Sequence, residues 1–147
     1  PRTLGALMAL YEGNYLKLGA LAPILGLAAT RSPATTGVAA GVTAVGRTPG
    51  DLDLHLAVDA VTRYTLDLRL TYLFDDAATP AADPDLHLRV YRDARMVEVI
   101  SWSVSHRHEV LQQLAVTSGR ELDRRWSRNL MLGKWLDYLA DRGHRLP

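Results

Sequence analysis

The chain has 147 residues, a formal net charge of +1 and no cysteine. This length fits one domain, and we expect a single domain over residues 1–147. A cysteine-free chain excludes a disulfide framework, a thiolate zinc site and a cysteine nucleophile, and it is compatible with the cytoplasm, where we expect the protein. The near-neutral charge gives no overall field for nucleic acid, and no apolar run approaches the roughly 20 residues of a membrane span, so we expect no membrane partner.

Apolar residues recur every three or four positions near the start of the chain, which predicts an amphipathic helix. They are Leu4, Leu7, Met8, Tyr11, Tyr15, Leu18 and Leu21. Thr3 is placed to cap the helix, and Pro23 marks the region of its end. Residues 26–50 are rich in Gly, Ala, Thr and Pro, and they predict a loop and a weak strand, with or without a helical turn.

Strict alternation of apolar and polar residues predicts two strands over 52–58 and 66–72. Facing the apolar sets places Leu56 opposite Leu66 and Leu54 opposite Leu68. On the polar face the same register predicts three complementary pairs: Asp53 with Arg69, His55 with Asp67, and Asp59 with Arg63.

A second hairpin is predicted after the Asp/Pro/Ala-rich segment 75–85. Loops of two or four residues centred on Asp93-Ala94 place Val90 opposite Val97 and Leu88 opposite Val99. Arg89 then faces Glu98 on the solvent side, where we expect them to pair.

The last predicted element is a helix with a broad apolar stripe and a likewise broad charged face. The stripe comprises Leu122, Trp126, Leu130, Leu132, Trp135, Leu136 and Leu139, and Gly143 is a stop signal. A helix, an antiparallel meander of four to five strands and a second helix predict an α+β fold, with the helices packed against one face of the sheet.

Several of these segments resemble a family known as domain of unknown function 1249, the YqiB-like bacterial proteins. The resemblance lies in residues 7–15 (LMALYEGNY), 21–23 (LAP), 62–65 (TRYT) and 88–99 (LRVYRDARMVEV), and in Asn129, Trp135-Leu136 and Gly143-His144. Residues 24–60 show little of it. The resemblance implies the same α+β fold and a bacterial cytoplasmic setting, but no activity.

The chain departs from the family pattern before the last helix. Family members carry an Arg-Tyr-x-Tyr-Pro segment and a His-Gln pair there, whereas residues 109–121 of this chain contain neither tyrosine nor proline. Asp123 and Arg125 keep the acidic-then-basic start of the helix. If that segment forms a site in the family, this member lacks it.

The most metal-like pattern is His106-x-His108 with the adjacent Glu109, which His87 or His144 would have to complete. Zinc needs three or four converging ligands, and nothing in the spacing brings these together. We therefore expect a solvated helix start, with no metal and no cofactor.

An oriented general base is the strongest enzymatic hypothesis, because the predicted register sets His55 beside Asp67. No serine in a sharp strand-to-helix turn accompanies this pair. We interpret the pair as an ordinary cross-strand contact and name no catalytic residue.

Arginines and tyrosines on the polar sheet face are the strongest candidate for ligand binding. They are Arg63, Tyr64, Arg89, Tyr91 and Arg92. Such side chains bind phosphate or stack on bases, although partners in Asp59 and Glu98 would make Arg63 and Arg89 structural.

Three functions follow. The first is a non-catalytic binding or interaction module that uses this face or the sheet edges, which are also available for homodimerisation. The second is an enzyme or sensor for a nucleotide or another phosphate-containing ligand. The third is a nucleic-acid accessory protein that uses Arg124, Arg125 and Arg128 on the last helix.

Overall fold

The computed structural model describes residues 3–27, 38–74, 81–103 and 121–147, with the backbone alone at 73–74, 81–84 and 103. Within these residues lie two long helices, α1 (Leu4–Leu21) and α3 (Glu121–Asp141), and a short 3-10 helix, η1 (Pro23–Leu25). The strands are β1 (Thr43–Gly46), β2 (Leu54–Val61), β3 (Thr65–Phe74), β4 (Ala81–Tyr91) and β5 (Met96–Ser103).

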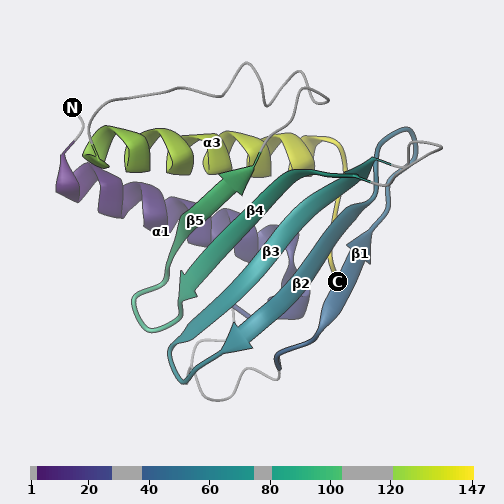
Figure 1. The fold of residues 1–147 in the computed structure, drawn as a ribbon, viewed down its shortest axis with the longest axis horizontal. Coiled ribbons are helices and arrows are strands. Elements are labelled where there is room, and N and C mark those ends of the chain that lie inside the picture. The colour runs from purple at the N-terminus through teal and green to yellow at the C-terminus, as the bar shows by residue number, and fades with distance from the viewer. Residues whose placement is uncertain (1–2, 28–37, 75–80, 104–120) are drawn as a thin grey trace.

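The strands form one antiparallel sheet in chain order, β1-β2-β3-β4-β5. Both long helices lie behind the sheet, so one sheet face is covered and the other is open (Figure 1). Alternate strand residues fill the covered face, and Leu56, Leu68 and Leu88 are each 1% exposed. The predicted α+β fold is therefore confirmed, with both helices on the same face.

Helix α1 begins where the sequence predicts, because the Thr3 hydroxyl accepts a hydrogen bond from the Ala6 amide at 3.1 Å. Leu7, Tyr11 and Leu18 are buried against the sheet and α3. The predicted apolar face is wrong at Leu4 and Met8, which are 67% and 38% exposed. These two residues lie in the first two turns of the helix, and their exposure shows that the buried stripe begins at Leu7.

The register of the β2–β3 hairpin differs from the predicted one by four residues. Leu54 pairs with Tyr72 instead of Leu68, and Leu56 pairs with Leu70. Alternation fixes which face a side chain takes, but a shift by an even number of residues leaves every side chain on the same face. The turn decides between such registers, and it lies at Thr62–Thr65, where the Thr62 amide donates to the Thr65 carbonyl at 2.9 Å.

This register removes all three predicted polar pairs. His55 lies opposite Thr71, and Ala57 lies opposite Arg69. A bulge between Val58 and Ala60 releases Asp59 from the regular pairing. The predicted contacts of Asp53 with Arg69, His55 with Asp67 and Asp59 with Arg63 are therefore wrong.

The β4–β5 hairpin has the predicted register, with Val90 opposite Val97, Leu88 opposite Val99 and Arg89 opposite Glu98. A bulge between His87 and Leu88 in this pairing sets His87 opposite Ser101. In the weakly patterned region 26–50, the described residues form only the short strand β1, while residues 28–37 lie outside the description.

Helix α3 buries Leu132, Trp135, Leu136 and Leu139 as predicted, but Leu130 is 38% exposed. Its end is set by Gly143, whose φ of +86° is a left-handed conformation that glycine adopts without strain. The amides of Gly143 and His144 donate to the carbonyls of Ala140 and Leu139, each at 3.0 Å. This pattern is a Schellman motif, which confirms the predicted stop signal.

Two buried asparagines join the helices to the edge strand β5. The Asn14 amide group of α1 donates to the Asn129 carbonyl of α3 at 2.8 Å, and the Asn129 side chain accepts from the Val99 amide of β5 at 2.9 Å. Asn129 also donates to the Arg125 carbonyl. Because both side chains are 1% exposed, these contacts fix the helices against β5.

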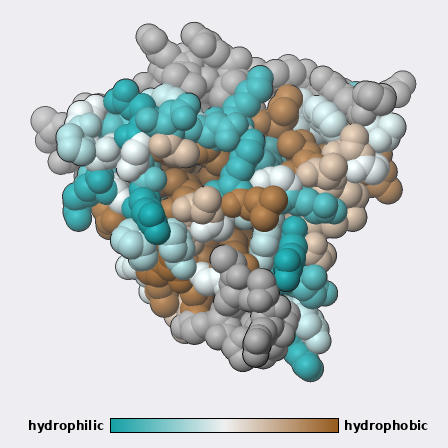
Figure 2. All heavy atoms as spheres, turned by 180° about the vertical axis from the view of Figure 1, so that it is seen from behind, coloured by the Kyte–Doolittle hydropathy of each residue, from teal (hydrophilic) through white to brown (hydrophobic). Residues whose placement is uncertain are grey.

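Viewed from behind, hydrophilic and hydrophobic residues are intermixed on the surface (Figure 2). Helix α1 carries exposed apolar side chains, of which Leu16 is the most exposed, at 72%. In the described segments, neither helix combines the length and the apolar character that a membrane crossing requires.

Candidate functional site

The open sheet face carries polar side chains from every strand, because residues that alternate with the buried leucines point away from the helices. Most of them are half-buried by their neighbours. The charged and titratable ones are His55, Asp59, Asp67, Arg69, Asp85, His87, Arg89, Tyr91 and Glu98. This open face is therefore the part of the described chain where polar chemistry is concentrated.

Both arginines of this face form ion pairs with carboxylates. Arg69 Nε lies 3.2 Å from Asp59 Oδ2, and Arg89 Nε donates to Asp67 Oδ1 at 2.8 Å. The sequence predicts Asp53 as the partner of Arg69 and Glu98 as the partner of Arg89. Arg89 does lie opposite Glu98 of β5, but its guanidinium binds Asp67 on the other neighbouring strand, β3. Contact with the Asp67 carboxylate raises the pKa of Arg89.

A hollow of about 410 Å³ lies over β1, β2 and β3 and reaches β4. Its volume falls in the range of small-molecule sites. The residues that line it are Thr43, Ala44, Val45, His55, Leu56, Ala57, Arg69, Thr71 and Asp85. Three polar groups of different chemistry, an imidazole, a guanidinium and a carboxylate, thus face one depression.

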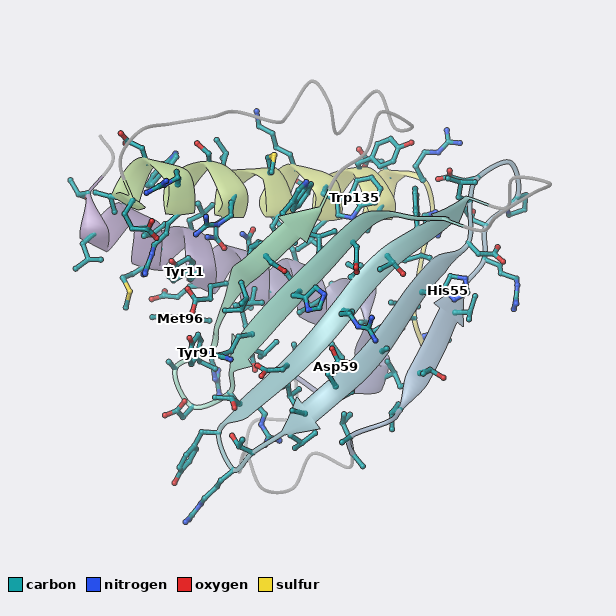
Figure 3. The ribbon with its side chains drawn as sticks, viewed as in Figure 1. Tyr11, His55, Asp59, Tyr91, Met96 and Trp135 are labelled. Atoms are coloured by element: carbon teal, nitrogen blue, oxygen red, sulfur yellow. The ribbon has the colours of Figure 1, made fainter. Side chains whose placement is uncertain are left out.

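The hollow follows from the strand register. One row across the sheet reads Val45, His55, Thr71, Asp85, and the next reads Thr43, Ala57, Arg69. Short side chains at Ala57 and Thr71 therefore stand between longer ones. His55 stands on β2, next to β1 (Figure 3).

Two groups in the hollow lack hydrogen-bond partners among the described residues. The imidazole of His55 makes no such bond, and Asp85 Oδ1 is buried without one. His55 and Asp85 stand on the two strands that flank β3, about 10 Å apart at the usual strand spacing. This separation of the two strands leaves room for a small ligand between His55 and Asp85.

The predicted general base of His55 with Asp67 is wrong, because His55 lies opposite Thr71 and Asp67 binds Arg89. Groups of three or more metal-ligating side chains are also missing from the parts of the chain that the structure describes. His106, His108 and Glu109 lie outside those parts.

His144 has a structural environment. Its Nε2 lies 2.9 Å from the Tyr72 hydroxyl and 3.0 Å from Asp51 Oδ2, and its side chain is fully buried. Arg142 also contacts Asp51, with Nε 3.3 Å from Oδ2. This network joins the β1–β2 connection, β3 and the end of α3, so it explains His144 as part of the core.

The predicted ligand-binding residues fall into two places. Arg89 and Tyr91 lie on the open face, where the Tyr91 hydroxyl donates to Glu98 Oε1 at 2.5 Å. Burial and this carboxylate raise the pKa of Tyr91. Tyr91 of β4 lies opposite Met96 of the edge strand β5, and both lie across the sheet from His55 (Figure 3).

The other three predicted residues surround the β2–β3 turn. Arg63 and Tyr64 are exposed at its tip, with the Arg63 guanidinium 5.2 Å from the Tyr64 ring centre. Arg92 is 8% exposed and donates to the carbonyls of Thr62 and Arg63. The buried Arg92 side chain therefore stabilises the turn through these hydrogen bonds.

The basic residues of α3 share one carboxylate. Arg125, Arg124 and Arg128 lie 2.9, 3.3 and 3.8 Å from the carboxylate of Glu121. These contacts are exposed and weak individually, but they place a negative charge at the centre of the basic surface.

The sequence reasoning did not identify Thr43, Ala57, Arg69, Thr71 or Asp85 as site residues. These residues lie together only in the observed β2–β3 register, which differs by four residues from the predicted register. The signal that would have revealed them is the Thr62–Thr65 turn, where the Thr62 hydroxyl accepts from the Thr65 amide at 3.0 Å.

An antiparallel sheet with both long helices on one face defines an α+β protein whose polar face is not covered by a described helix. A search of protein families matches residues 30–145 to the family described as "Protein of unknown function (DUF1249)". The chain belongs to this family. The match includes residues 30–60, where the resemblance was slight, and leaves out the first helix. No curated protein and no solved structure is significantly similar to the chain.

Proposed function

We propose that the protein is a non-catalytic binding module that holds a small polar ligand in the hollow of the open sheet face. The observation that carries the proposal is the hollow itself, which polar side chains from neighbouring strands line while apolar side chains and helices fill the opposite face. Concave sites with a few convergent polar groups are the usual places for small ligands.

The sheet edges offer less support for a strand-pairing partner or a homodimer. On β5 the Asn129 side chain already binds the Val99 amide, which an added strand would need. At the other edge β1 has only four residues. We therefore favour a ligand on the face over a partner at an edge.

The charge balance of the face disfavours a polyanion. Among the described side chains of strands β2 to β5, the outward arginines are Arg69 and Arg89, and the outward carboxylates are Asp59, Asp67, Asp85 and Glu98. Carboxylates outnumber arginines by two, so a phosphate-containing ligand or a nucleic acid would meet net repulsion here. On α3, the contacts of the three arginines with Glu121 likewise weaken the case for nucleic-acid binding.

Arg89 and Tyr91 keep a proposed role as contacts for a longer ligand. They lie on the same face, and Arg89 follows His87 along β4 next to the hollow. Arg63 and Tyr64 would contact only a partner that reaches the β2–β3 turn, and Arg92 would support that turn.

We also propose a bacterial cytoplasmic setting, which rests on the family resemblance. Its test is the recovery of the protein in the cytosolic fraction of a bacterial host, and recovery with the membrane or outside the cell would contradict it.

A thermal-shift screen with amino acids, amines, nucleosides, sugars and phosphates tests the binding proposal. A ligand at ten times its Kd adds about 1.4 kcal/mol and raises Tm by about 4 °C. The decisive variant is Ala57→Phe, which fills the hollow without touching the core. Ala60→Phe is the matched control, since Ala60 is exposed on the same strand outside the hollow.

The proposal predicts that a compound which stabilises the wild type also stabilises Ala60→Phe but not Ala57→Phe. Equal stabilisation of Ala57→Phe by every active compound, or no active compound in any class, would contradict it.

A further inference from the structure

Asp85 is the charged group of the hollow whose charge is least compensated. Its side chain is 29% exposed, and Oδ1 is buried without a hydrogen bond from a described residue. Its other oxygen lies 3.8 Å from His87 Nε2, beyond hydrogen-bond distance, and that imidazole carries a charge only when protonated. A carboxylate that is partly removed from water and has few donors is stabilised by a cationic partner.

The arginine that lines the hollow does not supply this partner. Arg69 lies opposite His87 on the neighbouring strand, and its guanidinium binds Asp59, with a second contact at 3.5 Å between Nη2 and Oδ1. The Arg69–Asp59 pair is neutral, so Asp85 carries the net charge among the described residues that line the hollow.

We infer that the ligand of the hollow is a small organic cation, an aliphatic amine or guanidine, whose charged group binds Asp85. This inference rests on the proposed function and specifies its ligand. An ammonium or guanidinium group compensates the charge of the Asp85 carboxylate in a charge-assisted hydrogen bond at its accessible oxygen.

The remaining lining residues fit the rest of such a molecule. Thr71 lies between Asp85 and His55, so its hydroxyl faces the middle of the ligand. Val45 and Ala57 offer apolar surface to a short carbon chain. His55 lies two strands from Asp85, with the two backbones about 10 Å apart, so its imidazole meets a polar group at the other end of the ligand.

Titration of the amide NMR spectrum with three compounds of the same four-carbon length tests the inference. They are 1,4-diaminobutane, 1,4-butanediol and succinate, which are cationic, neutral and anionic. We expect the diamine to shift the amides of His55, Thr71 and Asp85 at lower concentration than the other two. Asp85→Asn keeps the shape of the side chain and should weaken diamine binding about tenfold, as expected for one charge-assisted contact.

Asp53→Asn is the control for a general loss of negative charge. Asp53 pairs with Arg47 at 3.3 Å outside the hollow, and its replacement should leave diamine binding nearly unchanged. Equal weakening by both variants would show a diffuse charge effect and overturn the inference.

Tighter binding of succinate or butanediol at the same amides would overturn the ligand class but leave the proposed function intact. If the diamine shifts none of these amides, while another compound stabilises the wild type and not Ala57→Phe, the ligand class is wrong and the proposed function stands. The proposed function itself fails when every active compound stabilises Ala57→Phe as it does the wild type, or when no compound of any class is active.

Discussion

Gly133 of α3 passes so close to Asn14 of α1 that a Cβ atom at Gly133 would lie 2.8 Å from Asn14 Oδ1. Asn14 cannot move away without loss of its hydrogen bond to the Asn129 carbonyl. The close approach of the two helices therefore depends on the absence of a side chain at residue 133. The packing of the helices against the sheet depends on this approach.

Gly133→Ala should destabilise the protein by about 1–3 kcal/mol, the usual cost of overpacking a tight contact. Urea unfolding measures this change. Gly13→Ala is the matched control, because nothing lies within 4 Å of the Cβ position on that helical glycine. It should stabilise by about 0.5–1 kcal/mol, since alanine favours a helix. Effects of the same sign would contradict the packing account.

Asn129→Ala should cost about 1–3 kcal/mol, because it leaves the Val99 amide without its acceptor at a buried edge. Hydrogen exchange should accelerate at Val99 more than at Leu88, which lies opposite on β4. Ser127→Ala, a change at another buried polar residue of α3, serves as the control. Unchanged exchange at Val99 in Asn129→Ala would show that another group protects this amide.

The stability of the protein should fall in acid through Asp51. Burial raises the pKa of this carboxyl, but hydrogen bonds from the Leu52 amide, Tyr72, His144 and Arg142 more than offset burial and hold its pKa below the ordinary value of 3.8. A depressed folded pKa contributes stability that is present above pH 3.8 and lost as the pH falls through the folded value.

Urea unfolding at successive pH values below 5 measures this loss. Asp51→Asn should be less stable than the wild type at neutral pH and should show a smaller loss of stability in acid. A parallel decline in both proteins would assign the acid sensitivity to other carboxylates.

A double-mutant cycle between Arg89 and Asp67 should give a coupling of about 0.3–1 kcal/mol. The atoms are 2.8 Å apart, but the side chains are 41% and 37% exposed, so solvent screens the pair. The cycle between Arg89 and Glu98 should give less than half of that, because Glu98 accepts from Tyr91 instead. The reverse order would restore the pairing that the sequence predicts.

The two hairpins show how much of the fold could be predicted from the sequence. In both, alternation correctly assigns leucines and valines to the buried face. Only the second hairpin has a turn that the sequence marks, at Asp93-Ala94, and its register is correct. The first turns at Arg63-Tyr64, residues without the left-handed preference of Gly, Asn or Asp, and its register was therefore misplaced.

The site depended on that register. His55 was recognised as a polar residue on the open face, but its neighbours across β3 are Thr71 and then Asp85, which no local pattern joins to it. Arg89 illustrates a second limit. A central strand has two neighbours, and one predicted hairpin shows only Glu98, whereas the guanidinium binds Asp67 on the other side.

Crystals soaked with a library of small polar fragments test the central claim most directly. The account predicts fragment density in the hollow, over Ala57 and between His55 and Asp85, in the wild type and its absence there in Ala57→Phe. Fragments that occupy only the helix side or the turns, with the hollow of the wild type empty throughout, would contradict it.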